Sequence, residues 1–273
     1  LGGSVNITTN GTFVPYTSEN MTAYDLESDD FRYVQNGNTY QKVADDYRGN
    51  GVKYALTASC KGIKVGVIEY EVETETTGSD GTTTTTTKEY TVESGDYALV
   101  IDGTKVTINS SDDALHVNNG NMFVLSGNFN IATLDDGLTA DGLVRIEDGT
   151  ITVTTSYEGI EGAYVEINGG TINVTSSDDG INAASDDTSI TEYIIIAGGT
   201  VTVNAEGDGL DSNGTILISG GTITVYGPTN GGDSGLDADG GILVNGGTVF
   251  VTSAIGMVET PASNSEQCVI SYA

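Results

Sequence analysis

The stretch GTITVTTSYEGIEGAYVEINGGTINVTSS, residues 149–177, holds one complete period of a repeat and the start of the next. Its opening phrase is Gly-Thr followed by two aliphatic residues with one other residue between them. The phrase returns at 170–176, 199–205, 221–227 and 247–253, with a degenerate copy at 127–133. Successive copies of its threonine are 21, 29, 22 and 26 residues apart. Repeats of this length indicate a solenoid, in which each unit buries its apolar face by stacking on its neighbours.

Each unit consists of three short segments: an acidic segment centred on one aliphatic residue, a second apolar segment, and the Gly-Thr segment. In the Gly-Thr segments aliphatic and polar residues alternate, as in a strand of a sheet with one buried face. Three strands per coil with glycine-rich corners predict an all-β fold, a right-handed single-stranded parallel β-helix of about eight coils. The central aliphatic residues should stack in its core; they are Leu115, Leu138, Ile160, Ile181, Leu210 and Leu236.

Two weaker coils precede the clear ones. In KYALTASCKGI (53–63) a strand would begin at Lys53, ten residues before the central aliphatic residue Ile63, with Tyr54 and Leu56 facing inward. In KVTINSSDDAL (105–115) the same spacing precedes Leu115. Both segments are therefore predicted to belong to the solenoid.

The remaining segments do not follow the repeat. Residues 66–93 alternate on both sides of a Thr-rich turn, which is typical of a protruding β-hairpin. Residues 1–50 are predicted to form an N-terminal cap or edge strands, because open solenoid ends expose strand edges. The predicted division is thus a cap over 1–50 and a β-helix over 51–273, with insertions at two corners, 184–192 and 227–234.

Composition narrows the function. The 273 residues include 9 Lys and Arg against 39 Asp and Glu, a net charge of −30. Such a chain is not expected to bind nucleic acid or anionic membranes, which attract basic surfaces. No apolar run approaches the roughly 18 residues of a membrane span. Cys60 and Cys268 would lie about 38 Å apart at roughly 4.8 Å per coil, so they are predicted to be unpaired thiols.

The acidic segments place carboxylates in register. Two residues before the central aliphatic residue stand, in successive coils, Asp113, Asp136, Glu158, Asp179 and Asp208. Any one of these is explained by the preference of Asp for corners. A whole column at about 5 Å spacing is costly, since neighbouring like charges repel by roughly 1 kcal/mol even in water. Arg145 is the sole Lys or Arg of residues 106–273, so no counter-charge from the protein is expected.

Either protonation or a bound metal would relieve this repulsion. Oxygen-only ligands suit a hard cation, and the sequence therefore predicts several Ca²⁺ ions held between neighbouring coils. Three clusters are expected: Asp136 with Glu158 and Glu161; Asp179 with Asn182 and Asp208; and Asp208 with Asp211, Asp233 and Asp237. The full set of candidate ligands is Asp113, Asp135, Asp136, Glu158, Glu161, Asp178, Asp179, Asn182, Asp208, Asp211, Asp233 and Asp237.

The acidic phrases SDDALHVNNG, LDDGLTADG, SYEGIEGA and SSDDGINAA, with the late GMVETPASNSEQ, resemble a bacterial carbohydrate-binding domain family typified by clostridial parallel β-helix proteins. The resemblance covers about residues 51–270, with Thr139 where relatives tend to have His. It implies a fold similar to family 9 polysaccharide lyases, calcium binding, and affinity for plant cell-wall glycans such as polygalacturonate or cellulose. It also implies a secreted or cell-surface protein, from which any signal peptide would already be gone at Leu1.

Three functions remain open. A polysaccharide-binding module is favoured, with calcium bridging corner and sugar carboxylates; candidate sugar contacts are His116, Arg145, Tyr157 and Tyr226, and Tyr164 and Tyr193 are further aromatic candidates. A calcium-dependent pectate lyase would also need a basic residue to remove the C5 proton, and Arg145 is a poor candidate for that. A structural adhesin or an ice-binding β-helix would use the outward threonines. The oligomeric state is left open.

Overall fold

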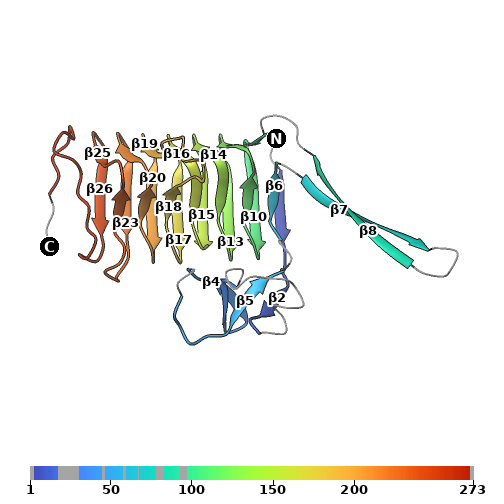
Figure 1. Ribbon diagram of the computed structural model, residues 1–273. Coiled ribbons are helices and arrows are strands. Elements are labelled where there is room, and N and C mark those ends of the chain that lie inside the picture. Colours follow the sequence, from blue (N-terminus) through green and yellow to red (C-terminus); the bar gives the residue numbers. More distant parts are fainter. Residues whose placement is uncertain are drawn as a thin grey trace.

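The computed structural model describes residues 3–17, 31–44, 47–57, 60–66, 68–77, 83–92 and 97–270. They form a row of stacked coils, with a small antiparallel sheet beside one corner and a hairpin at the N-terminal end (Figure 1). The predicted all-β parallel β-helix is confirmed. The described residues contain no helix, and hence none suited to spanning a membrane.

One long face of the solenoid is an eight-stranded parallel sheet made by the Gly-Thr segments. Its strands, in spatial order, are β1 (Ser4–Thr8), β10 (Thr104–Ser110), β13 (Gly127–Thr133), β15 (Thr150–Thr155), β17 (Thr171–Ser176), β20 (Thr200–Ala205), β23 (Thr222–Tyr226) and β26 (Thr248–Thr252). Equivalent residues pair across coils, as Ile151 does with Ile172. The aliphatic side chains of this sheet point inward because β-strands alternate faces.

The other two segments of each coil form a twelve-stranded sheet with two rows. The first row contains β6 (Ile63–Val65), β11 (Leu115–Val117), β14 (Leu138–Ile146), β16 (Ile160–Ile167), β18 (Ile181–Ala183), β21 (Leu210–Ser212) and β24 (Leu236–Ala238). The second row contains β9 (Tyr97–Ile101), β12 (Gly120–Val124), β19 (Tyr193–Ile196), β22 (Thr215–Ile218) and β25 (Ile242–Val244), with β14 and β16 running through both rows.

Strand order therefore gives seven complete coils, and β26 begins an eighth. The predicted central aliphatic residues pair in one continuous column from Ile63 through Leu115 to Leu236. All six of them from Leu115 onward are buried, with at most 5% of their surface exposed. A core of this kind stabilises the fold through apolar burial shared between adjacent coils.

Glycines at the corners allow the coils to approach closely. Gly159 immediately precedes the central Ile160, and a Cβ there would lie 2.2 Å from Cγ1 of Val174 and 2.3 Å from the carbonyl oxygen of Gly180. Gly149 begins a Gly-Thr segment with φ of 120°, a conformation that other residues rarely adopt. The stacking therefore requires Gly159, and the backbone conformation at the start of the segment favours glycine at position 149.

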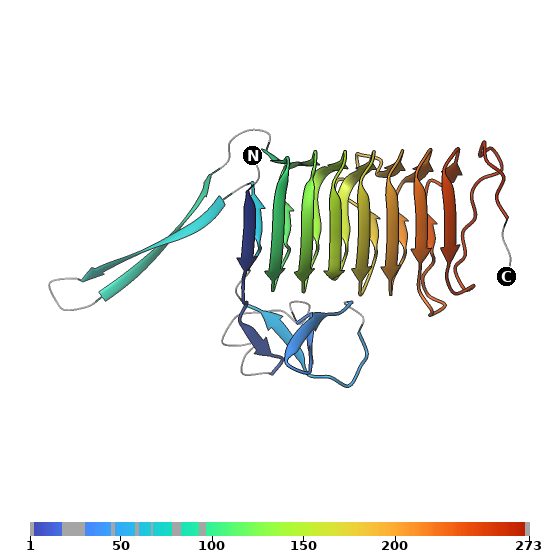
Figure 2. The same cartoon turned by 180° about the vertical axis from the view of Figure 1, so that it is seen from behind.

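The N-terminal region differs from one expectation. Strand β5 (Lys53–Leu56) does not belong to a coil; it pairs antiparallel with β2 (Phe13–Pro15) and β3 (Tyr33–Asn36), and β3 pairs with β4 (Thr39–Lys42). The coil strand next to β10 is β1, whose Val5 and Ile7 repeat the aliphatic alternation (Figure 2). The predicted coil position of Tyr54 and Leu56 is wrong, because β1 already occupies that edge.

The hairpin predicted over 66–93 is present. Strands β7 (Ile68–Thr77) and β8 (Thr83–Val92) pair antiparallel from Ile68 with Val92 to Thr77 with Thr83, and they extend away from the coils (Figure 1). Both cysteines are free, as predicted from their separation.

Candidate metal centre

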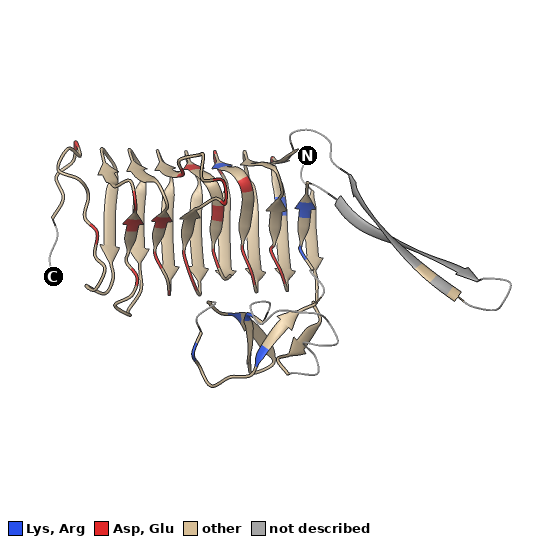
Figure 3. Ribbon diagram, in the orientation of Figure 1, with Lys and Arg blue, Asp and Glu red and all other residues tan. Residues whose placement is uncertain are grey.

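The acidic corner follows the C-terminal ends of the eight-stranded sheet, on the side where the small sheet lies (Figure 3). There the carboxylates hydrogen-bond to the coil that follows. Asp113 Oδ1 accepts the amide N–H of Asp136 at 3.2 Å, and Asp136 Oδ1 accepts that of Glu158 at 3.1 Å. Asp179 Oδ1 accepts the amide of Asp208 at 2.7 Å, and Asp208 accepts that of Ser234. The column therefore has a structural role that the sequence reasoning missed.

A second column runs along the first strand row, one residue beyond each central aliphatic residue. Strand pairing aligns Lys64, His116, Thr139, Glu161, Asn182, Asp211 and Asp237 in that order. The two columns lie side by side, so carboxylates of one column come close to carboxylates of the other. This is why the candidate ligands gather between coils, as predicted.

The first such meeting point is Asp136 with Glu158 and Glu161, whose carboxylate oxygens lie within 4.8 Å of one another. Thr139 donates to Glu161 Oε2 at 3.0 Å, and Asn182 Nδ2 donates to Glu158 Oε2 at 3.1 Å. Asn182 is 7% exposed, and among the described residues its Oδ1 has no hydrogen-bond partner. A buried carbonyl oxygen without a donor, on a residue bonded to this carboxylate group, fits a hard cation, because hard cations prefer oxygen ligands.

The second meeting point is Asp208 with Asp211 and Asp237, again within 4.8 Å. Asp233, predicted with them, does not join this group, and Asp179 joins no such group among the described residues. Asp178 lies next in the chain to Asp179 and is half-buried. The structure thus brings together the first predicted cluster and most of the third.

The electrostatics match this crowding. Burial, then the charges of Asp135 and Glu158, raise the pKa of Asp136 well above its usual value. Burial and Glu161 do the same for the pKa of Glu158. Burial and neighbouring carboxylates raise the pKa of Asp179 to about 8, that of Asp211 to about 7 and that of Asp208 to about 6. Without a cation, Asp179 is therefore largely protonated at neutral pH and Asp211 about half protonated.

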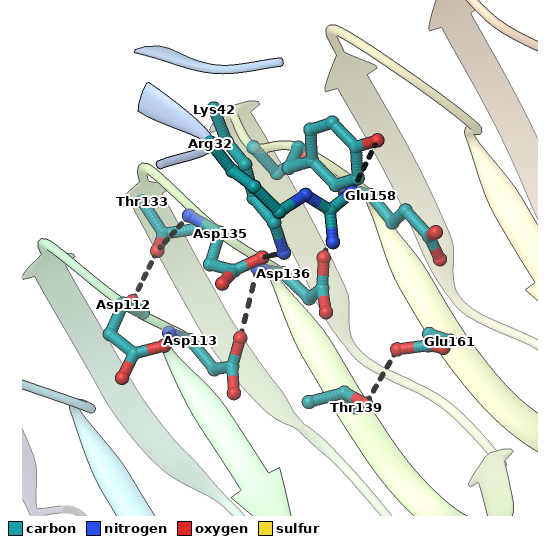
Figure 4. A network of polar contacts seen from close by, with 12 residues as sticks. Arg32, Lys42, Asp112, Asp113, Thr133, Asp135, Asp136, Thr139, Glu158 and Glu161 are labelled. Atoms are coloured by element: carbon teal, nitrogen blue, oxygen red, sulfur yellow. Dashed lines mark hydrogen bonds and ion pairs between the residues drawn. The ribbon is translucent and has the colours of Figure 1, made fainter. Parts of the chain in front are cut away.

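The carboxylate oxygens of a third group, Asp112 with Asp113 and Asp135, also lie within 4.8 Å of one another, but lysines contact this group. Figure 4 shows Lys42 at Asp135. Lys61 Nζ contacts Asp112 Oδ1 at 3.1 Å and also contacts Asp113, and Lys42 contacts Asp135. The expectation that no protein cation balances the column is therefore wrong at its N-terminal end. Lys61, two residues before Ile63, stands in register with Asp113, whereas Lys42 reaches the corner from the small sheet.

The predicted sugar contacts are dispersed. His116 Nδ1 lies 2.6 Å from Asp113 Oδ2, and Arg145 Nη2 lies 2.6 Å from Glu166 Oε2 on the outer face of the second strand row. Tyr157 is buried, with Lys42 Nζ 4.6 Å from its ring centroid. Tyr226 is 48% exposed. The rings of Tyr164 and Tyr193 stack on each other at 4.7 Å. Of these aromatic side chains, Tyr157 is covered by the small sheet and offers no open face.

A groove of about 830 Å³ runs beside the first cluster. Asp136, Thr139 and Glu161 line one part of it together with His116, and residues of the inserted corner 184–190 line another. A cation held by the first cluster would be accessible from this groove.

Part of the chain is similar to known proteins. The family model described as carbohydrate-binding domain-containing protein matches residues 131–266. A solved structure, the polysaccharide lyase-like protein from C. thermocellum in its gadolinium derivative, is 19% identical, covers 55% of this chain and 77% of that chain, and has a TM-score of 0.42. No curated protein matches the chain. The resemblance inferred from the acidic phrases is confirmed, since residues 131–266 match the carbohydrate-binding domain family model.

Proposed function

We propose that the protein binds an acidic polysaccharide through calcium ions held at the acidic corner. The observation that carries this proposal is the first cluster of three carboxylates, two of which, Asp136 and Glu161, line the 830 Å³ groove. The neighbouring Asn182 is buried, and its Oδ1 has no partner among the described residues. Asp136, Glu158, Glu161 and Asn182 would hold one ion there, and Asp208, Asp211 and Asp237 would hold another. The ions supply positive charge to a surface that otherwise repels anions.

The ligand class follows from charge. A chain with net charge −30 repels a polyuronate such as polygalacturonate unless cations lie between them. Calcium takes six to eight oxygen ligands, so carboxylates of the protein leave positions for carboxylates of the sugar. Polyuronates of this kind occur in plant cell walls. We therefore propose that the protein is extracellular or attached to the cell surface.

Binding is favoured over lyase activity by the position of Arg145. Its guanidinium is held by Glu166, away from the acidic corner. At that corner, Lys42 and Lys61 are engaged in ion pairs with carboxylates. A lyase needs a free base next to the metal-bound uronate.

The test is titration of the protein with oligogalacturonate in calcium and in EDTA. We expect binding in calcium and loss of at least tenfold in affinity in EDTA. Equal affinity in both would contradict the proposal. Release of ultraviolet-absorbing unsaturated product during the same titration would instead identify a lyase, and thermal hysteresis without sugar binding would identify an ice-binding surface.

A further inference from the structure

The three acidic groups differ in one respect. Only the group of Asp112, Asp113 and Asp135 contacts ammonium groups among the described residues. The side chains involved are largely buried: Asp113 is 5% exposed, and Lys61 is 18% exposed. These ion pairs are therefore less screened by solvent than surface pairs are.

Both lysines are held in place by the fold. Lys42 ends β4 of the small antiparallel sheet, which lies against the acidic corner (Figure 4). Its ammonium group also sits over the ring of Tyr157, and Tyr33 of the same sheet donates from its hydroxyl to Asp135 Oδ2 at 3.4 Å. Lys61 lies between β5 and β6, two residues before Ile63 enters the first coil.

The charge states agree with this pairing. Burial alone would raise the pKa of Asp113, but the hydrogen bond with His116 and the charge of Lys61 bring it down to about 2. Burial lowers the pKa of Lys61, but the nearby carboxylates of Asp113 and Asp112 raise it more, so the pKa lies above its usual value. Asp136, one coil further and without a lysine, has a raised pKa instead.

We propose that Lys42 and Lys61 are built-in counter-ions that take the place of a metal ion at the first acidic group. A tethered ammonium group has a high effective concentration at its partner, so free calcium competes poorly for the same carboxylates. Calcium is thereby confined to the groups of Asp136 and Asp208. This inference rests on the proposed function only in taking those two groups as calcium sites.

The test is calorimetric titration of the full chain with Ca²⁺ alone. Replacing both lysines by the uncharged, similarly long Met (Lys42→Met with Lys61→Met) should add one calcium ion per chain relative to the wild type. The matched control is Lys64→Met with Lys105→Met, which removes the same charge from two exposed positions and should add none. Neither lysine forms an ion pair with a carboxylate in the part of the chain that the structure describes. Lys61→Arg keeps the charge and should also add none.

Loss of Lys42 would weaken attachment of the small sheet, so Lys61→Met alone provides a second variant. It leaves Lys42 on Asp135 and should still gain weak calcium binding at Asp112 and Asp113. Near-ultraviolet circular dichroism reports the tyrosines of the small sheet and shows whether it has stayed in place.

The outcomes separate the two proposals. An unchanged number of ions in both lysine variants, or the same gain in the Lys64 and Lys105 control, would overturn the counter-ion role. A wild type that binds no calcium would contradict the proposed function. A gain of one ion on removing the lysines would support the counter-ion role in either case.

Discussion

The amide N–H of Glu158 donates to Oδ1 of Asp136 at 3.1 Å, although the two residues lie in different coils. Asp136 thus satisfies a backbone donor of the next coil with one oxygen and faces Glu158 and Glu161 with its charge. Structural and metal-binding roles meet in one carboxyl group. Mutations that remove the charge and mutations that remove the acceptor should therefore have different effects.

We expect Asp136→Asn to stabilise the calcium-free protein at pH 8 by about 1 kcal/mol, because an amide keeps the acceptor and removes a buried charge whose pKa is raised. Asp136→Ala should destabilise it by about 1–3 kcal/mol, because the Glu158 amide loses its acceptor. Both should abolish calcium binding at this group. Urea unfolding in EDTA measures the difference; equal stability of the two variants would contradict the dual role.

The calcium-free protein should lose stability as pH rises from about 5 to 8. The folded pKa values of Asp208, Asp211 and Asp179, about 6, 7 and 8, exceed the unfolded value of about 3.9, so the folded chain binds more protons over this range. Raised carboxyl pKa values make stability fall as these groups ionise. Calcium binds the ionised form and should reduce the fall. Thermal melts from pH 5 to 8, with calcium or EDTA, check this; a rise with pH in EDTA would contradict it.

The period of the sequence repeat was enough to predict most of the fold. Ile160 and its equivalents could be predicted because a core position returns once in every coil and its alternation is visible within five residues. Tyr54 and Leu56 were misplaced because the ten-residue spacing before Ile63 matched by coincidence, while β1, some sixty residues before β6, supplied the coil strand. Spacing within a segment cannot reveal a strand contributed from so far away.

The acidic groups show the same limit. Register alone placed Asp136 beside Glu158 and Glu161, since equivalent positions stack in a solenoid. Register also places Lys61, two residues before Ile63, next to Asp113 in the same column. It did not reveal Lys42 at Asp135, because this contact spans 93 residues and depends on how the small sheet packs. Contacts between repeats followed from the sequence, and contacts between the repeat and the non-repeating sheet did not.

Gly159→Ala should destabilise the protein by about 1–3 kcal/mol, because the added Cβ would lie 2.2 Å from Val174 Cγ1 and 2.3 Å from the Gly180 carbonyl oxygen. The Gly180 carbonyl oxygen belongs to the backbone of the next coil and cannot easily move away from the added Cβ. Gly3→Ala, where nothing lies within 4 Å, is the control and should change stability by less than about 0.5 kcal/mol. Urea unfolding of both variants measures the contrast, and equal effects would show that the coils have room to separate.

Asn182→Ala should weaken calcium binding at the Asp136 group about tenfold, a loss of about 1.4 kcal/mol. The change removes the unpartnered Oδ1 and the hydrogen bond to Glu158 Oε2, which holds that carboxylate in place. The measurement is calcium calorimetry in an Asp211→Asn background, where only the Asp136 group is left to bind. Asn204→Ala, at an exposed position on the opposite sheet, is the control. If Asn182→Ala left the affinity unchanged, the carbonyl oxygen would not be a ligand, and the ion would be held by the three carboxylates alone.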